Sequence, residues 1–104
     1  MQITKRVTFI AKDGSENKLK ELLEAMVIPS KKENGCLNYN IYQYKDNKKK
    51  FMAVETWENE EALNGHKQSK HYKIYKSSYE PFVESKYTDE LDYLITIWKK
   101  HLQL

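Results

Sequence analysis

The stretch from Phe51 to Tyr72 reads FMAVETWENEEALNGHKQSKHY, and it decides the fold because a strand runs directly into helical sequence within it. The segment Phe51–Trp57 is rich in aromatic and β-branched residues, which favour strands. Asn59 is a favoured helix N-cap, and two glutamates follow it in the first turn, where acidic side chains stabilise a helix. The stretch therefore predicts a strand at Phe51–Trp57 and a short helix from Asn59 to about Lys67.

Three further segments have the composition of strands. Ile3–Lys12 alternates apolar and polar residues, as a half-buried strand does. Leu37–Tyr44 does the same, and the short Lys-rich turn that follows makes it the antiparallel hairpin partner of Phe51–Trp57. We expect the fourth strand at Leu91–Trp98, which is apolar on both faces, and irregular chain from Glu84 to Asp89.

Two helical regions fill the gaps between these strands. The first has an apolar stripe at helical spacing, formed by Leu19, Leu22, Leu23, Met26 and Val27. Pro29 kinks or interrupts this helix, and Gly35 is suited to end it. The second region continues beyond the short helix from Ser69 to about Phe82.

The predicted order is β-α-β-β-α-β, which is the α+β, ferredoxin-like arrangement of a four-stranded antiparallel sheet with two helices on one face. We expect one domain over residues 1–98 and a C-terminal tail over residues 99–104. Because the strands present apolar residues on both faces and the helices cover only one, the other face predicts an interface. The expected assembly is a homodimer with the two sheets packed face to face.

Composition narrows the function classes. The 104 residues carry a net charge of +3, and Arg6 is the only arginine, whereas readers of nucleic acid normally use several arginines. No apolar run is long enough for a membrane span, and no apolar signal region opens the chain. The single cysteine, Cys36, excludes an internal disulfide. We therefore expect a cytoplasmic protein with no nucleic-acid or membrane partner and a small-molecule substrate.

The chain resembles the antibiotic biosynthesis monooxygenase (ABM) domain family over roughly Ile3 to Ile97. Four pieces carry the resemblance, and they occur in the family's order. They are Phe9-Ile10-Ala11-Lys12-Asp13-Gly14, Asn34-Gly35-Cys36-Leu37-Asn38-Tyr39, Glu55-Thr56-Trp57-Glu58-Asn59-Glu60-Glu61-Ala62-Leu63, and His66 with Ser69-Lys70-His71-Tyr72. Together they form a fairly specific package, although each piece alone is weak.

The resemblance implies a dimeric α/β barrel and a small-molecule enzyme, often a cofactor-independent oxygenase that acts on quinol-like or polyketide aromatics. The same fold also hosts enzymes that degrade haem and enzymes that process a quorum-sensing signal, so the family does not fix the reaction. Haem degraders resemble one another in an Asn on strand one, a helical Trp and a later His. In this chain, strand one has no asparagine, the Trp position holds His66, and the position of the later His falls near Lys76. These differences argue against haem degradation.

Two histidines are the candidate catalytic groups. An imidazole such as that of His66 can remove a phenolic proton near neutral pH and so create the electron-rich anion that cofactor-free oxygenation needs. The alternative is a helical histidine that simply bonds to a carboxylate or a backbone carbonyl. His71 could assist His66, or it could cap a helix and face water. Tyr72 could orient a substrate oxygen through its hydroxyl, or extend the aromatic stripe.

The remaining candidates would bind substrate. Trp57 is either core or a wall against a flat ligand. The stripe of Tyr75, Tyr79 and Phe82 is more often core, although a pocket beneath that helix would use the same residues. Asn40 and Glu55 are polar side chains on strands, and either could hold a substrate oxygen or pair with a neighbour.

We expect neither a metal site nor a bound cofactor. His66 and His71 lie five residues apart across a helix break, without the spacing of a metal motif, and no glycine-rich phosphate loop occurs. The leading hypothesis is therefore a cofactor-independent monooxygenase for a small aromatic or quinol-like molecule. A non-catalytic small-molecule-binding or stress-response dimer is the alternative, as is an isomerase that processes a small oxygenated signal.

Overall fold

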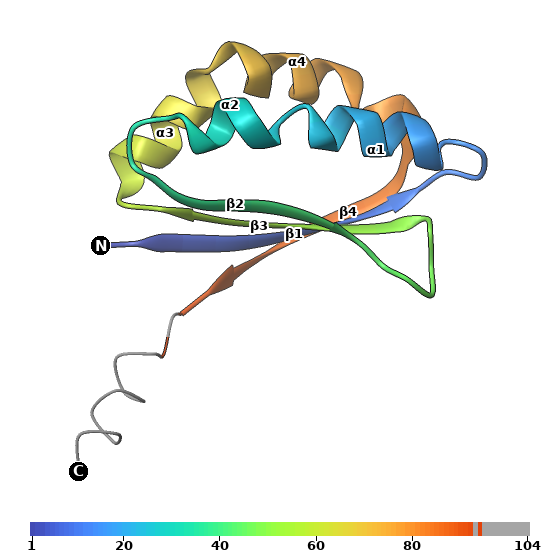
Figure 1. Ribbon diagram of the computed structural model, residues 1–104, viewed down its shortest axis with the longest axis horizontal. Coiled ribbons are helices and arrows are strands. Elements are labelled where there is room, and N and C mark those ends of the chain that lie inside the picture. Colours follow the sequence, from blue (N-terminus) through green and yellow to red (C-terminus); the bar gives the residue numbers. More distant parts are fainter. Residues whose placement is uncertain (93, 95–104) are drawn as a thin grey trace.

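A four-stranded antiparallel sheet forms one layer of the protein and the helices form the other, as the computed structural model shows for residues 1–92 and 94 (Figure 1). The strands are β1 (Ile3–Ala11), β2 (Cys36–Gln43), β3 (Lys50–Trp57) and β4 (Val83–Leu91), in the order β2-β3-β1-β4. This is the α+β, ferredoxin-like fold that the sequence predicts, and the β2–β3 hairpin is confirmed.

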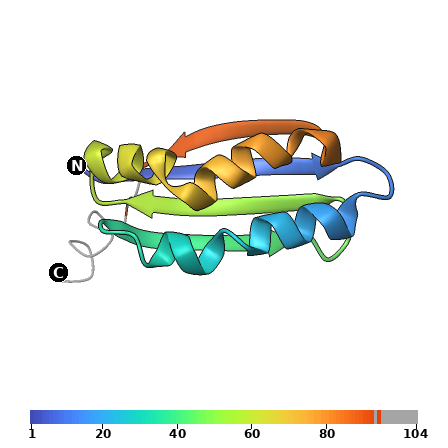
Figure 2. The ribbon, with the colours of Figure 1, turned by 90° about the horizontal axis from the view of Figure 1, so that it is seen from above.

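The helices lie on one face of the sheet. They are α1 (Glu16–Glu24), α2 (Val27–Lys31), α3 (Glu60–Gln68) and α4 (Lys70–Ser78), followed by the 3₁₀ turn η1 (Glu80–Phe82). In Figure 2, α1 and α2 run in line above β2, while α3 and α4 cover the side of the sheet that holds β1 and β4. The predicted break near Pro29 falls between α1 and α2, because proline has no N–H for the carbonyl one turn earlier.

The predicted position of the fourth strand is wrong. Val83–Leu91 forms β4 and pairs with β1 from Thr4 to Ala11, so the segment 84–89, expected to be irregular, is strand. The sequence misleads here because β4 is an edge strand with few apolar residues and no clear alternation, and pairing with β1 overrides its low apolar content. Of the predicted strand, residues 93 and 95–98 lie outside the described part of the chain, as does the tail 99–104.

Strict alternation along β3 separates the two faces of the sheet. Phe51, Ala53, Glu55 and Trp57 point toward the helices and are buried, with Trp57 completely inaccessible. Met52, Val54 and Thr56 point to the other face, which none of the described helices covers. Leu37 lies at a β-bulge between Cys36 and Asn38 and is 52% exposed.

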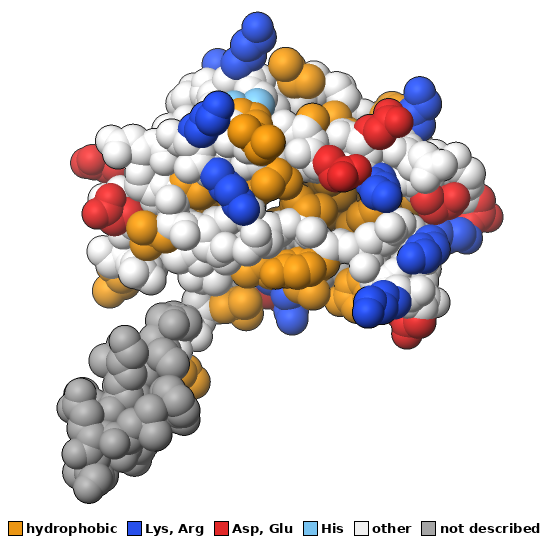
Figure 3. All heavy atoms as spheres, viewed as in Figure 1, with side chains coloured by type: hydrophobic (Ala, Val, Ile, Leu, Met, Phe, Trp, Pro, Cys, Tyr) orange, Lys and Arg blue, Asp and Glu red, His pale blue; other side chains and the backbone are white. Residues whose placement is uncertain are grey.

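The uncovered face carries several large apolar side chains. Tyr42, Tyr87 and Leu91 are all substantially exposed there, at 53%, 51% and 39%. Val54, on the central strand β3, lies on the same face, with Arg6 on β1 and Asn40 on β2 as its cross-strand neighbours. Figure 3 shows hydrophobic side chains both between the layers and along the uncovered side of the sheet.

The helices of the described region are short. None of them has the length and apolar character needed to cross a lipid bilayer.

Candidate functional site

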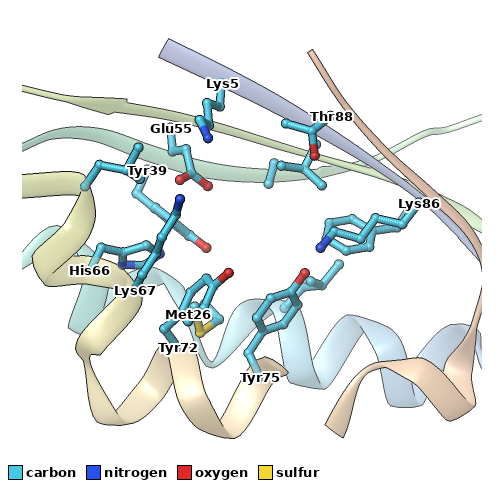
Figure 4. Close-up of a pocket in the computed structure, with 15 residues that line it drawn as sticks. Lys5, Met26, Tyr39, Glu55, His66, Lys67, Tyr72, Tyr75, Lys86 and Thr88 are labelled. Atoms are coloured by element: carbon cyan, nitrogen blue, oxygen red, sulfur yellow. The ribbon is translucent and has the colours of Figure 1, made fainter. Parts of the chain in front are cut away.

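A cavity of about 100 Å³ lies between the sheet and helices α3 and α4 (Figure 4). All four strands of the sheet and the helices α1, α3 and α4 contribute to its wall. Its polar lining consists of Lys5, Tyr39, Glu55, His66, Lys67, Tyr72, Tyr75, Lys86 and Thr88. Five predicted site residues are therefore brought together here: His66, Tyr72, Glu55 and Tyr75 line the cavity, and Trp57 lies directly behind it.

The β3 strand places Glu55 and Trp57 on the same side because they are two residues apart. The indole Nε1 of Trp57 donates a 2.9 Å hydrogen bond to Oε1 of Glu55, whose residue is only 8% exposed. The bond satisfies both buried polar groups, since an unpaired buried carboxylate would be strongly unfavourable. Trp57 thus acts on the cavity by holding Glu55 rather than by forming its surface.

Helix α3 delivers His66 to the cavity wall. The helix begins at the predicted N-cap, where the side chain of Asn59 accepts a 2.9 Å bond from the N–H of Ala62. Leu63 and His66 are three residues apart, so both point inward, and His66 is 1% exposed. Its ring packs against Trp57, with centroids 4.5 Å apart, and against Tyr72 at 5.1 Å.

One oxygen of Glu33 joins the two histidines. Oε2 of Glu33 lies 2.6 Å from Nδ1 of His66 and 2.8 Å from Nε2 of His71. Glu33 follows α2 and reaches the histidines because Gly35 allows the next turn to pass close to α3. Gly35 has a φ of +84°, and a Cβ there would lie 2.5 Å from the Cβ of Ala62.

Glu33, His66 and His71 also form the group of side chains, within the described residues, that could hold a metal ion. A tetrahedral zinc ion with bonds of ~2.0–2.1 Å would keep its ligand atoms roughly 3.3 Å apart. The contacts of 2.6 and 2.8 Å to the carboxylate oxygen are shorter and have the length of charge-assisted hydrogen bonds. The observed spacing is therefore that of hydrogen bonds between the carboxylate and the two imidazole rings.

Three tyrosines aim their hydroxyls into the cavity. Figure 4 shows the oxygen atoms of Tyr39, Tyr72 and Tyr75 converging on its centre. Burial raises the pKa of Tyr39 well above its usual value, and the charge of Glu55 adds to the effect. Burial likewise raises the pKa of Tyr75. These two phenols stay protonated and can donate hydrogen bonds to a ligand oxygen.

Lysine side chains make the cavity cationic. Lys86 on β4 projects its amine toward the cavity, over the rings of Tyr79, Tyr75 and Phe9 at 4.7, 5.5 and 5.9 Å. Burial, followed by the charge of Lys76, lowers the pKa of Lys86. Lys67 points inward from the opposite side in Figure 4. Cation–π attraction to these aromatic rings keeps the Lys86 amine directed toward the cavity.

Sequence reasoning did not single out Glu33 or Lys86, nor the lining residues Tyr39, Lys5 and Lys67. Glu33 lies 33 residues before His66, and only the tertiary contact of the turn after α2 with α3 brings the two together. Lys86 falls in the segment expected to be irregular. Local periodicity gives no signal for either Glu33 or Lys86. Correct placement of β4, however, would have put Lys86 beside Phe9 on the inner face of the sheet.

Besides Trp57, four predicted residues lie outside the cavity lining. Asn40 pairs across the strands with Val54, on the face turned away from the helices, and its amide donates to Asn38. Tyr79 stacks on Tyr75 with centroids 5.0 Å apart, and Phe82 packs against the core. His71 touches the cavity only through Glu33 and His66.

Comparison with known proteins identifies a matching family and several similar proteins and structures. The family model described as "Antibiotic biosynthesis monooxygenase" matches residues 3–77. The Mycobacterium tuberculosis protein named "Putative monooxygenase Rv0793" is 30% identical over 69 residues, which are 66% of this chain and 67% of that protein. The crystal structure of PA3566 from Pseudomonas aeruginosa is 29% identical with a TM-score of 0.86, covering 89% of this chain and 94% of that one. The "Putative antibiotic biosynthesis monooxygenase" from Nitrosomonas europaea, at 19% identity and a TM-score of 0.83 over 89% and 90% of the two chains, shares the fold.

Proposed function

Because this chain belongs to the antibiotic biosynthesis monooxygenase family, we propose that it is a cofactor-independent monooxygenase of a small hydroxylated aromatic or quinol-like molecule. The observation that carries the proposal is the placement of His66. Its ring is buried on the cavity wall and its Nδ1 is bound by a carboxylate, which leaves the other nitrogen for a ligand.

In the proposed reaction, His66 removes the hydroxyl proton of the substrate. The electron pair of the broken O–H bond stays on the substrate and makes its ring carbon electron-rich enough to react with dioxygen. One oxygen atom is then inserted into the C–H bond of that ring carbon, which becomes C–OH, and the other leaves as water with the two hydroxyl hydrogens of the quinol, which becomes a quinone. The substrate supplies all the electrons, so the balance needs no cofactor.

The cavity wall supports the anion that this step creates. The lining carries the lysines Lys5, Lys67 and Lys86 against the single carboxylate of Glu55, so it favours a negative ligand. Tyr39, Tyr72 and Tyr75 would donate hydrogen bonds to the substrate oxygen. We assign Trp57 and Tyr79 to holding Glu55 and Tyr75 in place, and Phe82 to the core behind them.

The volume of the cavity limits the size of the substrate. Ligand pockets usually measure ~300–1,000 Å³, whereas this one is about 100 Å³. A one-ring quinol therefore fits with small shifts of the lining, and a larger ligand needs the long side chains of Lys67 and Lys86 to swing aside. The same small volume favours the second candidate function, a non-catalytic dimer that binds a small ligand without turnover.

Oxygen consumption separates these functions. We expect one-ring quinols to be oxidised by the wild type and the rate to fall about 10²-fold or more in His66→Gln, because a glutamine amide cannot act as the base. Lys70→Gln, an exposed change on α4, is the control and should leave the rate unchanged. Equal rates in wild type and His66→Gln would remove His66 from the mechanism. Saturable quinol binding without oxygen uptake would favour the binding protein.

We also propose that the working unit is a homodimer. The support is the uncovered sheet face, where Tyr42, Tyr87 and Leu91 are exposed on the same side as Val54. Exposed apolar clusters of this kind mark interfaces. Asn40 lies on that face, so its contribution would be to the dimer contact and not to substrate binding.

A further inference from the structure

We propose that Glu33 and His71 are positioning residues of the site: Glu33 fixes the proton of His66 on Nδ1, and His71 holds Glu33 in place. Nε2 of His66 is then the nitrogen that accepts the substrate proton. The inference rests on the proposed role of His66 as a base, but it concerns an arrangement of protons that can be measured without any substrate.

The tautomer of His66 follows from its contact with Glu33. An ionised carboxylate oxygen can only accept hydrogen bonds, so the 2.6 Å contact requires a proton on Nδ1 of His66. A neutral imidazole carries a single ring proton, and Nε2 therefore keeps its lone pair. Among the side-chain hydrogen bonds of the described residues, the His66 ring takes part through Nδ1 only. Nε2 is free to meet a ligand in the cavity that His66 lines.

The proton of His71 is fixed independently by Ser69. The Ser69 hydroxyl donates a 2.6 Å bond to the backbone carbonyl of His66, which uses its only proton. Its oxygen can then only accept from Nε2 of His71, 3.2 Å away, just as Oε2 of Glu33 accepts at 2.8 Å. Nε2 of His71 must therefore carry the proton that both oxygens share.

The carboxylate is consequently held from two sides by donors on two different helices. His66 belongs to α3 and His71 to α4, and both bond to the same oxygen. This leaves the Glu33 side chain, which is 16% exposed, little freedom to rotate away. An oriented carboxylate that keeps a histidine in one tautomer is the arrangement that makes the opposite ring nitrogen a base.

Glu33 also stabilises the product of the proton transfer. When the substrate O–H bond breaks, its electron pair stays on the substrate oxygen and a new N–H bond forms at Nε2 of His66. The ring then carries a positive charge, and the carboxylate oxygen already lies 2.6 Å from its other nitrogen. Opposite charge at this distance favours the imidazolium. Glu33 acts through His66 and does not touch the substrate.

Nitrogen-detected NMR of histidine-labelled protein reads the tautomers directly. In the wild type we expect protons on Nδ1 of His66 and Nε2 of His71, with signals assigned by their loss in His66→Gln and His71→Gln. In Glu33→Gln the amide can donate to Nδ1 of His66, so we expect the His66 proton to move to Nε2 in part or in full. Glu61→Gln, an equal charge change at an exposed position of α3, should leave both tautomers unchanged.

Steady-state kinetics of quinol oxidation provide a second test of the positioning roles. We expect Glu33→Gln to lower kcat about 10²-fold with KM changed less than about threefold, because the substrate contacts remain. His71→Ala should lower kcat by roughly tenfold, and His71→Gln should recover part of it, since a glutamine N–H can still donate to Glu33.

Three results would overturn the proposal. They are a wild-type His66 protonated on Nε2, a His66 tautomer that Glu33→Gln leaves unchanged, and stoichiometric uptake of Zn²⁺ at micromolar concentration with loss of both histidine proton signals. The last result would identify a metal site instead. Absence of any quinol oxidation would refute the proposed function alone, because the NMR result would still stand or fall by itself.

Discussion

The two faces of the sheet satisfy their polar groups in different ways. On the covered face, buried polar side chains pair with one another, as Glu55 does with Trp57 at 2.9 Å and Glu33 with His66 at 2.6 Å. On the uncovered face, the ion pair of Arg6 and Asp89 is about 40% exposed, and apolar side chains occupy the positions between polar ones. On the covered face, the buried polar groups find their partners within one chain. On the uncovered face, apolar side chains remain exposed to water.

This difference suits the covered face to a site with fixed side chains and the uncovered face to contact with another surface. Buried hydrogen-bonded networks favour one arrangement of side chains over others, because breaking any bond leaves a polar group without a partner. The covered face can therefore hold His66, Glu55 and the tyrosines in fixed positions. Exposed apolar area has no such constraint, and its natural stabilisation is burial against another surface.

Removing the aromatic support of the covered face should have the largest effect. Trp57→Ala deletes a fully buried indole and leaves Glu55 without its donor, so we expect a loss of about 3–5 kcal/mol in the free energy of unfolding. Thermal and denaturant unfolding measure it. Tyr42→Ala, an aromatic truncation on the uncovered face, should cost under about 1 kcal/mol in the isolated chain. Equal losses for the two variants would erase the distinction between the faces.

A charge on the uncovered face should act on association instead of folding. Val54→Lys places an amine beside Arg6, its neighbour on β1, and the two-fold axis of a dimer would repeat that charge. We expect the dimer dissociation constant to rise about 10²-fold, the equivalent of roughly 3 kcal/mol. Light scattering over a concentration series measures this. Ile74→Lys, an equivalent change at a 51%-exposed site on α4, is the control. A wild type that is monomeric at micromolar concentration would refute the dimer.

Local sequence was enough to predict the elements whose signals are local. The strand β3 alternates strictly, and the N-cap of α3 forms with the residue expected, Asn59. Both depend on contacts between residues a few positions apart, which periodicity and capping rules describe well.

The remaining features depend on contacts between distant segments. β4 is a strand because β1 pairs with it, although Val83–Leu91 has little apolar periodicity. His66, a predicted site residue, lines the cavity, but its partner Glu33 lies in the turn between α2 and Gly35, 33 residues earlier in the chain. Sequence alone therefore located the cavity's aromatic and histidine wall and missed the charged groups, Glu33 and Lys86, that complete it.

Alkaline titration should reveal the smallest difference between the faces. Because burial raises the pKa of Tyr75, the folded chain keeps this phenolic proton above about pH 10, where the unfolded chain, with the ordinary value of 10.0, loses it. The unfolded state then binds fewer protons, so the free energy of unfolding falls by about 1.4 kcal/mol per pH unit for each such group. Tyr39 contributes in the same direction, whereas the lowered pKa of Lys86 opposes it in every variant.

Tyr75→Phe should therefore remove about 1.4 kcal/mol per pH unit from the alkaline slope, leaving the share of Tyr39. Urea unfolding at a series of pH values from about 9 to 11 measures the slope. Tyr42→Phe, on the uncovered face and 53% exposed, is the matched control and should leave the slope as in the wild type. A slope unchanged in Tyr75→Phe would mean that this hydroxyl loses its proton as readily in the folded chain as in the unfolded one. The covered face would then be open to water at the cavity, and the dry, donor-lined site would not exist.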